Sequence, residues 1–443
     1  MVRQRLGIGD RMKVLELFGG IGACTQALKR LGIDVEIADY VEIDKYAVAS
    51  YNAMNGTHFE PQDICEWDKD IDVDLIMHGS PCQDISLAGK QAGADEGSGT
   101  RSSLMYETIR IVNKLKPKYV IWENVKNLIS KKHRHNFDKY LQALSEGGYR
   151  NYWQVLNAKD YGIPQNRERV FTISIRNDID KDFKFPQKQE LKLRLKDLLE
   201  DEVDEKYYLS EKMINYIVAD NEKWFGNNDK SIINKTVASA INTGEGQRRC
   251  DASNYISKEL GQNFNIKAMG DNFIQYNNQR ANQTIENHKE EIKENSFLDC
   301  YNNKVLNDGT TPTITSRISA SNNSFIAIKN ATKKGYDEAT EGDSIDLTYP
   351  NSTTRRGRVG HQVSQTIPAS DTKGVVVPQY NNLRIRKLTP KECWRLMGFS
   401  DEAFEKARKV NSNTQLYKQA GNSIVVNVLV EIFKKLLGDN TNE

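Results

Sequence analysis

The residue of this sequence with the most distinctive chemistry is Cys82, in the segment His78-Gly-Ser-Pro-Cys-Gln-Asp-Ile-Ser-Leu-Ala-Gly89 that follows a short apolar run. A thiol is nucleophilic only as the thiolate, and a free cysteine has a pKa of about 8.5, so a nearby positive charge must favour ionisation. Arg167 and Arg169 are the candidates for that charge. The carboxyl group of Glu123 is expected one strand away. Together these residues suit the addition of a thiolate to a substrate that an acid hydrogen-bonds.

Other interpretations of Cys82 are open at this point. Most free cysteines are buried and inert, and a thiol hydrolase would need a partner histidine, which is not obviously placed here. The six cysteines are scattered without a Cys-x-x-Cys pair, so neither a zinc site nor a disulfide framework is indicated. His133 and His135 fit a solvated basic loop better than a metal site. We therefore expect no metal and a reducing compartment.

Three early segments are typical of a nucleotide-binding domain. The apolar run Lys13–Phe18 is followed by Gly19-Gly-Ile-Gly22 and then by a helical pattern, so a ligand can approach the backbone at the start of a helix. A second expected strand, 35–41, ends at Glu42. This acid lies about 20 residues past the glycines, where such folds bind ribose hydroxyls. Asp63 is a candidate for an adenine amino group.

Strand-like and helix-like segments alternate from about residue 13 to 175, which predicts a doubly wound α/β domain. Glu123 falls at the C-terminal end of the expected strand Tyr119–Trp122, the edge where open parallel sheets place their chemistry. Near the other end of the chain, Thr389 and Glu392 form a capping box with Pro390 at the first helical position, so a short helix is expected to begin there.

The middle of the chain is different in composition. From about residue 221 to 382 it is rich in Asn, Ser, Thr and Gly with short strand-like pieces, which predicts a smaller, irregular, mainly β domain. The expected domains are 1–205 plus 405–443, and 206–404. Two basic clusters in the second domain are either solvated charge or contacts to the bases and phosphates of a nucleic acid. They contain Arg248, Arg249, Arg355, Arg356 and Arg358.

Composition sets limits on partners and location. A length of 443 residues suits two domains, and a net charge of only +2 means that any nucleic-acid footprint must be local. No apolar stretch is long enough to span a bilayer, and no signal peptide is predicted. We expect a cytoplasmic protein without membrane contact.

The thiol, the acid and the nucleotide-like site together suit pyrimidine methylation. Carbon 5 of cytosine becomes nucleophilic after a thiolate adds at carbon 6 and an acid hydrogen-bonds nitrogen 3, and the resulting enamine can attack a methyl sulfonium. The chain resembles the DNA (cytosine-5) methyltransferase family of prokaryotic or phage type. The resemblance rests on motifs that occur in the order of that family: Phe18-Gly-Gly-Ile-Gly22, Glu42, Gly79-Ser-Pro-Cys-Gln83, Glu123-Asn-Val125, Gln165-Asn-Arg-Glu-Arg169, Arg386 to Phe399 and Gln419-Ala-Gly-Asn-Ser423.

The resemblance implies a role for each matching residue. It makes Cys82 the nucleophile and Glu123 the acid at nitrogen 3, and it places Arg167 and Arg169 around the cytosine and the thiolate. The implied fold is a Rossmann-like doubly wound mixed sheet with a target-recognition domain at 206–404. The methyl donor would be S-adenosyl-L-methionine, bound without a metal by Phe18, Gly19, Gly20, Gly22, Glu42, Ile43, Asp63, Ile64, Pro81, Asn422 and Ser423.

The resemblance also implies how the substrate is handled. Gln83 and Ser86 stand where the family has a loop that closes on DNA, and the target base is flipped out of the duplex. The expected partner is double-stranded DNA. The expected context is a monomer that protects phage DNA or accompanies a cognate restriction endonuclease, which acts separately.

Some residues depart from the family pattern, and two rival functions share most of it. Glu16 replaces an Asp, Ala23 a Gly, and Asp84 and Ile85 alter the loop after the nucleophile. An RNA cytosine-5 methyltransferase would use the same catalytic residues, although the long middle segment argues against it. A catalytically silent DNA-binding protein would not need an intact Cys82.

Overall fold

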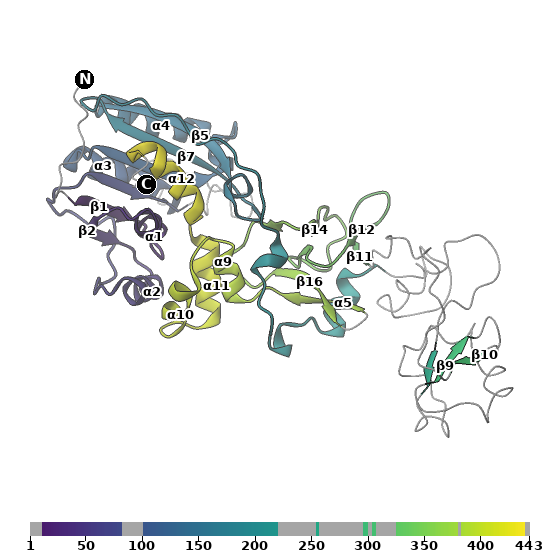
Figure 1. Ribbon diagram of the computed structural model, residues 1–443. Coiled ribbons are helices and arrows are strands. Elements are labelled where there is room, and N and C mark those ends of the chain that lie inside the picture. The colour runs from purple at the N-terminus through teal and green to yellow at the C-terminus, as the bar shows by residue number, and fades with distance from the viewer. Residues whose placement is uncertain are drawn as a thin grey trace. The chain divides into compact units, whose positions relative to one another are not determined.

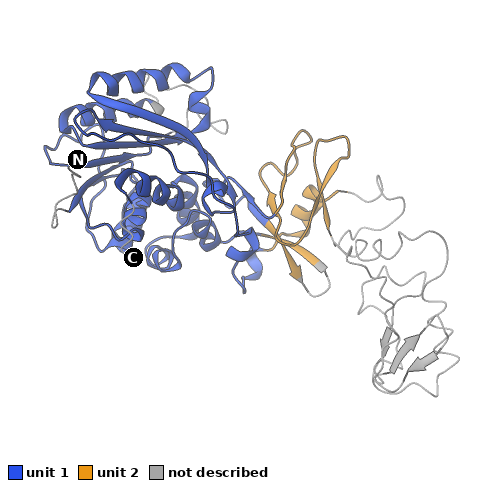
Figure 2. Cartoon of the chain, turned by 45° about the horizontal axis from the view of Figure 1, so that its top comes forward, with its two compact units in different colours: residues 1–207, 362–374, 387–443 blue, residues 208–361, 375–386 orange. Residues whose placement is uncertain are grey.

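The computed structural model describes residues 11–81, 101–219, 254–256, 296–299, 304–306, 325–379 and 382–438. The chain divides into two compact units (Figure 2): unit 1 contains residues 1–207, 362–374 and 387–443, and unit 2 contains residues 208–361 and 375–386. Residues 206–207, 362–374 and 387–404 were predicted to lie in the second domain, whereas they belong to unit 1. The reason is visible at Trp394, whose fully buried indole donates a hydrogen bond to the carbonyl oxygen of Leu416 at 3.0 Å.

Unit 1 is built on a six-stranded mixed sheet of order β2-β1-β3-β4-β7-β5 (Figure 1). Strands β1 to β4 run parallel, so their carboxyl ends meet at one edge, and β7 is antiparallel to both β4 and β5. This order confirms the predicted mixed α/β fold. The strands are β1 (Met12–Leu17), β2 (Val35–Val41), β3 (Leu75–His78), β4 (Tyr119–Val125), β5 (Tyr149–Asn157) and β7 (Glu168–Arg176).

Helices α3 (Met105–Leu115) and α4 (Arg134–Glu146) pack against the sheet through one apolar stripe each. In α3 the buried positions are Met105, Thr108, Ile111 and Val112, the spacing of a single helix face. They share a core with Leu15, Leu17, Ile76, Val120 and Trp122 of the sheet. Burying a side chain of this size stabilises the fold by about 1.5–3 kcal/mol, so this core fixes β3 and β4 side by side.

The C-terminal helices belong to unit 1. Arg30 of α1 donates a hydrogen bond to Asn427 of α12 at 2.7 Å, and α1 packs along α12. The capping box is confirmed, because Thr389 accepts from the Glu392 amide and the Glu392 carboxylate accepts from the Thr389 amide. The remaining helices of this unit are α1 (Ala23–Arg30), α2 (Lys45–Asn55), α9 (Pro390–Arg395), α10 (Asp401–Arg408), α11 (Asn413–Asn422) and α12 (Val426–Leu437).

The described part of unit 2 contains short antiparallel strands around a small core of Ile217, Ile328, Ile345 and Val376. A four-stranded sheet has the order β14-β13-β16-β17, and β11 pairs with β12 as a hairpin. The bounds are α5 (Glu211–Ile217), β8 (Asn254–Ile256), β9 (Ser296–Asp299), β10 (Lys304–Leu306), β11 (Ile326–Lys329), β12 (Tyr336–Ala339), β13 (Ser344–Asp346), β14 (Val359–Gly360), β16 (Lys373–Gln379) and β17 (Asn382–Lys387). Among the helices of the described residues, none is long and apolar enough to cross a bilayer.

Candidate active site

The carboxyl edge of β3 and β4 brings the segment before Cys82 close to Glu123. His78 pairs in register with Trp122, so Gly79 and Glu123 both lie one residue beyond the paired positions. A Cβ added at Gly79 would lie 3.7 Å from Oε2 of Glu123. Cys82, Gln83 and Ser86 lie outside the described residues. The structure therefore positions the chain up to Pro81 beside the carboxyl group that the sequence analysis assigned as the acid.

Glu123 is a buried carboxyl group that faces two arginines. Its Oε1 lies 3.1 Å from Nε of Arg169, which β7 places opposite because Val125 pairs with Arg169. Burial raises the pKa of Glu123 above its ordinary value, although the charges of Arg169 and Arg167 act in the opposite direction. Glu123 therefore holds a proton more readily than a surface glutamate does, which suits a group that donates a hydrogen bond.

Arg167 is buried and is bonded to the C-terminal part of the chain. Its guanidinium donates to the carbonyl oxygens of Ile367 (3.3 Å), Gly421 (3.1 Å) and Ser423 (2.8 Å). The segments meet closely, because a Cβ added at Gly421 would lie 2.4 Å from the backbone of Pro368 and Ala369. Arg167 thus connects the Gln165–Arg169 segment to residues 421–423 at the catalytic edge.

A hydrogen-bonded group that the sequence analysis missed holds the residues before Cys82. The indole of Trp122 donates to the Ser80 hydroxyl at 3.0 Å, and the Asn124 amide donates to the Ser80 carbonyl at 3.2 Å. At the end of β3, Nε2 of His78 lies 2.7 Å from the Tyr140 hydroxyl. Burial lowers the pKa of His78 to about 3, so the imidazole ring stays neutral. The signal for this group was the adjacency of Ser80 to Pro81-Cys82 and of Asn124 to Glu123.

The glycine-rich turn after β1 is open on one side and closely packed on the other. A Cβ at Gly19 would lie 2.6 Å from the Tyr40 ring, and one at Gly22 would lie 2.5 Å from the Tyr51 ring, so neither position accepts a side chain without movement. Gly20 has a φ of 53° and open space around its Cα, and Phe18 also has a positive φ of 52°. This backbone can be approached closely by a ligand.

The acid that follows β2 reaches this turn. Glu42 accepts hydrogen bonds from the amides of Gly20 (3.0 Å) and Asp44 (2.9 Å), and burial raises its pKa. The next residue, Ile43, is 67% exposed, which is unusual for an isoleucine. Glu42 therefore ties the end of β2 to the glycine turn.

The other cofactor candidates lie at two further places in unit 1. Asp63 accepts from the Cys65 amide at 2.9 Å, and its neighbour Gln62 donates its backbone amide to the Glu42 carbonyl at 2.9 Å, so this loop is tied to the Glu42 segment. Ile64 is buried. Ser423 is also buried, whereas Asn422 is exposed at the end of α11. Within the described ranges there is no cluster of three metal-ligating side chains.

Glu16 is a second buried carboxyl group, behind the glycine turn. It accepts hydrogen bonds from the amide and hydroxyl of Thr25 at the start of α1, and the Thr25 hydroxyl lies 3.0 Å from the Tyr51 hydroxyl. Burial raises the pKa of Glu16 to about 7. Because the folded-state pKa is raised, stability is highest below the unfolded-state pKa and is lost as the pH rises through 7.

The variant Glu16→Gln is expected to remove this loss, since a glutamine oxygen can accept the same bonds without ionising. Its free energy of unfolding should gain about 3 kcal/mol relative to wild type between pH 4.5 and 8.5, at about 1.4 kcal/mol per pKa unit. Urea denaturation at both pH values measures the difference. An equal offset at the two pH values would show that Glu16 does not titrate in this range.

The arginines predicted to contact DNA are only partly described. Arg248 and Arg249 lie outside the described residues. In unit 2, Arg356 is exposed, Arg355 is half-buried and Arg358 is 1% exposed. The structure therefore brings only one of the three described arginines fully to the surface.

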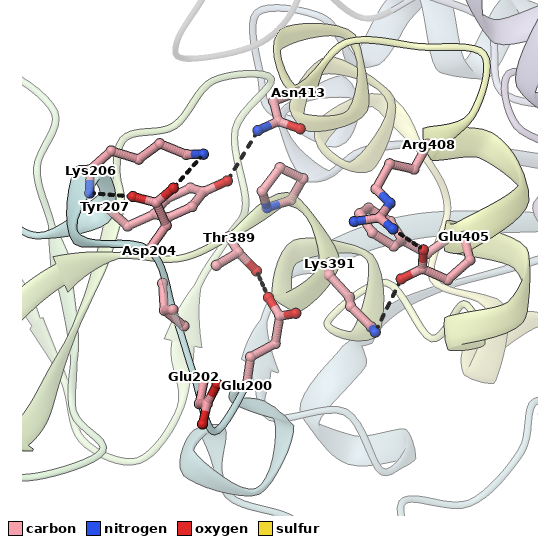
Figure 3. A pocket seen from close by; sticks show the side chains of 13 residues that line it. Glu200, Glu202, Asp204, Lys206, Tyr207, Thr389, Lys391, Glu405, Arg408 and Asn413 are labelled. Atoms are coloured by element: carbon pink, nitrogen blue, oxygen red, sulfur yellow. Dashed lines mark hydrogen bonds and ion pairs between the residues drawn. The ribbon is translucent and has the colours of Figure 1, made fainter.

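A pocket of about 350 Å³ lies elsewhere in unit 1, around α9 and the segment before residue 208 (Figure 3). Its side chains largely pair with one another, as in Thr389 with Glu200, Lys391 with Glu405, and Asn413 with Tyr207. It contains none of the residues predicted for catalysis. Because its side chains pair with one another, we assign this pocket a structural role in unit 1.

Comparisons with known proteins identify the family of this chain. The family model described as C-5 cytosine-specific DNA methylase matches residues 12–438. The orphan methyltransferase M.SPRI of Bacillus phage SPR is 33% identical, over 98% of this chain and 99% of that protein. The type II methyltransferase M2.ScrFI of Lactococcus lactis subsp. cremoris is 34% identical, over 82% of this chain and 67% of that protein.

Solved structures support the fold independently. DNMT2 from Spodoptera frugiperda, solved as a mutant, matches with a TM-score of 0.52 and 17% identity over 96% of this chain and 99% of that chain. The methyltransferase EhMeth of Entamoeba histolytica matches with a TM-score of 0.51, over 97% of this chain and 99% of that chain. Because one family model covers nearly the whole chain and a relative above 30% identity spans it, the protein belongs to the C-5 cytosine-specific DNA methylase family.

Proposed function

We propose that this DNA cytosine-5 methyltransferase acts through a covalent bond between Cys82 and a cytosine flipped out of double-stranded DNA. The observation that carries the proposal is the buried Glu123, whose pKa is raised and which lies at the same sheet edge as the Gly79–Pro81 segment leading to Cys82. A carboxyl group of this kind can hydrogen-bond nitrogen 3 of cytosine in its protonated form.

In the proposed reaction the Cys82 thiolate adds to carbon 6 while Glu123 donates its hydrogen bond to nitrogen 3. The electron pair of the ring double bond moves to carbon 5, which forms the new bond to the methyl group as the bond between that methyl and the donor's positively charged sulfur breaks. The sulfur keeps the electron pair of the broken bond, and the donor leaves as a neutral thioether. The proton on carbon 5 then goes to a base, and the carbon–sulfur bond breaks to release the thiolate. Arg169 holds the Glu123 carboxyl in place, and Arg167 holds residues 421–423 beside it.

Members of this family take the methyl group from S-adenosylmethionine, which supplies an electrophilic carbon on a positively charged sulfur. The described residues fit it: Glu42 suits the ribose hydroxyls, Ile43 the adenine face and the glycine turn the amino acid part. We assign the same task to Asp63, Ile64, Pro81, Asn422 and Ser423. No metal is part of the proposal.

We assign target recognition to the segment 206–404, most of which forms unit 2, and cofactor binding and catalysis to unit 1. The phage orphan and type II methyltransferases among the relatives support a role in protecting DNA inside a bacterial cell, with any cognate restriction endonuclease acting separately. We propose that one chain methylates DNA as a monomer.

Trapping with 5-fluorocytosine tests the covalent step. A fluorine at carbon 5 cannot leave as a proton, so the adduct should accumulate when methyl donor is present. The methylated site is first mapped by bisulfite sequencing of DNA treated with the protein and S-adenosylmethionine. Duplexes carrying the modified base at this mapped site should form a complex that survives denaturing electrophoresis. Identical duplexes with ordinary cytosine are the matched control. A complete absence of the complex, with donor present and methylation of the control duplex intact, would overturn the covalent mechanism.

A further inference from the structure

The loop of residues 347–358 in unit 2 connects two strands that pair antiparallel, β13 and β14. This loop carries the three arginines that the sequence analysis grouped as one DNA-contacting cluster. The structure gives them different surroundings. Arg358 and Arg355 form hydrogen bonds and an ion pair within unit 2, and Arg356 is exposed.

Arg358 is the internal support of the loop. Its side chain is buried, and its guanidinium donates to the carbonyl oxygens of Asp346 at 3.2 Å and Tyr349 at 2.9 Å. A buried charge is tolerated only when its donors are satisfied, and the guanidinium fork suits several carbonyl groups at once. Further carbonyl acceptors within 3.5 Å belong to Thr348, Pro350 and Ser352. The loop is therefore folded around Arg358, which DNA cannot reach in this arrangement.

Arg355 anchors the same loop at a second point. Its guanidinium pairs with the carboxylate of Asp346, whose side chain is 6% exposed. Its carbonyl oxygen accepts from the Ala331 amide at 2.8 Å, so the loop is also bonded to the residues after β11. With Arg358 and Arg355 both engaged, the loop has a defined shape before any ligand arrives.

This shape presents one cation and one aromatic ring to solvent. Arg356 is exposed, and in the described part of the chain its side chain has no hydrogen bond or ion pair. Tyr349 is 73% exposed and has a φ of 50°, a conformation that residues other than glycine rarely adopt. The Tyr349 carbonyl oxygen accepts hydrogen bonds from the Arg358 guanidinium and, at 3.0 Å, from the Ser352 amide. The framework thus keeps a large ring outside the core.

We propose that Arg356 and Tyr349 are the specificity-determining residues of this loop, and that Arg358 and Arg355 are positioning residues. Arg356 reads a guanine through its O6 and N7 atoms, and Tyr349 packs its ring against a neighbouring nucleotide. The inference rests on the proposed assignment of target recognition to unit 2. It goes beyond that assignment because it names which side chains touch DNA and which only hold them.

The test compares variants on the mapped cognate duplex and on duplexes that each carry one changed base pair. Arg356→Ala should lower kcat/KM on the cognate duplex about 10–100-fold, with discrimination lost at one G·C pair. Arg356→Lys should keep affinity but lose that discrimination, since an ammonium cannot make the paired contact. Tyr349→Ala should lower kcat/KM, whereas Tyr349→Phe, which keeps the ring, should have a kcat/KM close to that of wild type.

Arg408→Ala is the matched control, because it removes an exposed arginine of unit 1 that lies in α10. It should leave kcat/KM and base preference unchanged. Arg358→Ala should lose discrimination at the same base pair as Arg356→Ala, which a merely destabilised fold would not do. Circular dichroism and affinity for S-adenosylmethionine check that the variants are folded.

Two outcomes separate this inference from the proposed function. If wild type methylates its site and neither Arg356→Ala nor Tyr349→Ala changes kcat/KM or base preference, the assignment of this loop is wrong and the proposed function stands. If wild type methylates its site but no complex forms with the 5-fluorocytosine duplex, the proposed covalent mechanism fails. The base preference of Arg356→Ala and the kcat/KM of Tyr349→Ala then still decide whether this loop contacts DNA, and unchanged values in both variants would overturn the inference.

Discussion

Replacing Cys82 by serine is expected to lower the methylation rate by about 10⁴-fold or more, because a serine hydroxyl does not ionise near neutral pH and cannot add to carbon 6. Affinity for duplex DNA and for S-adenosylmethionine should change little, since those contacts are assigned to other residues. Transfer of tritiated methyl groups measures the first quantity, and equilibrium binding measures the others.

Cys65→Ser serves as the matched control. Cys65 is an exposed free cysteine in unit 1, and the replacement changes the same atom without touching the proposed nucleophile. It should leave the methylation rate unchanged. Turnover by Cys82→Ser within tenfold of wild type would remove Cys82 from the proposed mechanism.

Replacing Glu123 by glutamine is expected to lower kcat by about 10²–10⁴-fold, the usual contribution of a positioned acid. Glutamine keeps the shape and can hydrogen-bond the base, but it cannot supply a proton. The pH dependence should change as well. The raised pKa of Glu123 means that wild type loses its acid form as the pH rises through that value, so the decline of kcat on the alkaline side should be absent in the variant.

Glu123→Asp separates geometry from acidity, since it retains the acid and shortens the side chain. We expect a partial loss of kcat with the alkaline decline preserved. Methylation assays from pH 5 to 9 give both profiles. An unchanged kcat in Glu123→Gln would show that the reaction does not need an acid at this position.

The parts of the fold that depend on neighbouring residues could be predicted from the sequence. The capping box at Thr389 and Glu392 is a local pattern, and the alternation of strands and helices led directly to the mixed sheet. The place of residues 387–404 was not predictable in the same way, because it depends on Trp394 packing against α11.

The candidate site shows the same division. Motif spacing led to Glu42 and Glu123, which the structure places at one edge of the sheet. It did not reveal that Trp122 and Asn124 hold Ser80, or that Arg167 bonds carbonyl oxygens more than 250 residues away. The burial of Arg358 was also invisible, since one basic cluster looks alike whether its members face solvent or the backbone.

The bonds of Arg167 also constrain how the protein is made. Arg167 and Ser423 are 256 positions apart, which at about 5–20 residues per second separates their emergence from the ribosome by roughly 10–50 s. Arg167 therefore leaves the ribosome well before two of the carbonyl oxygens that accept its hydrogen bonds. A chain that ended before residue 421 would contain Arg167 and Glu123 but would lack both of these acceptors.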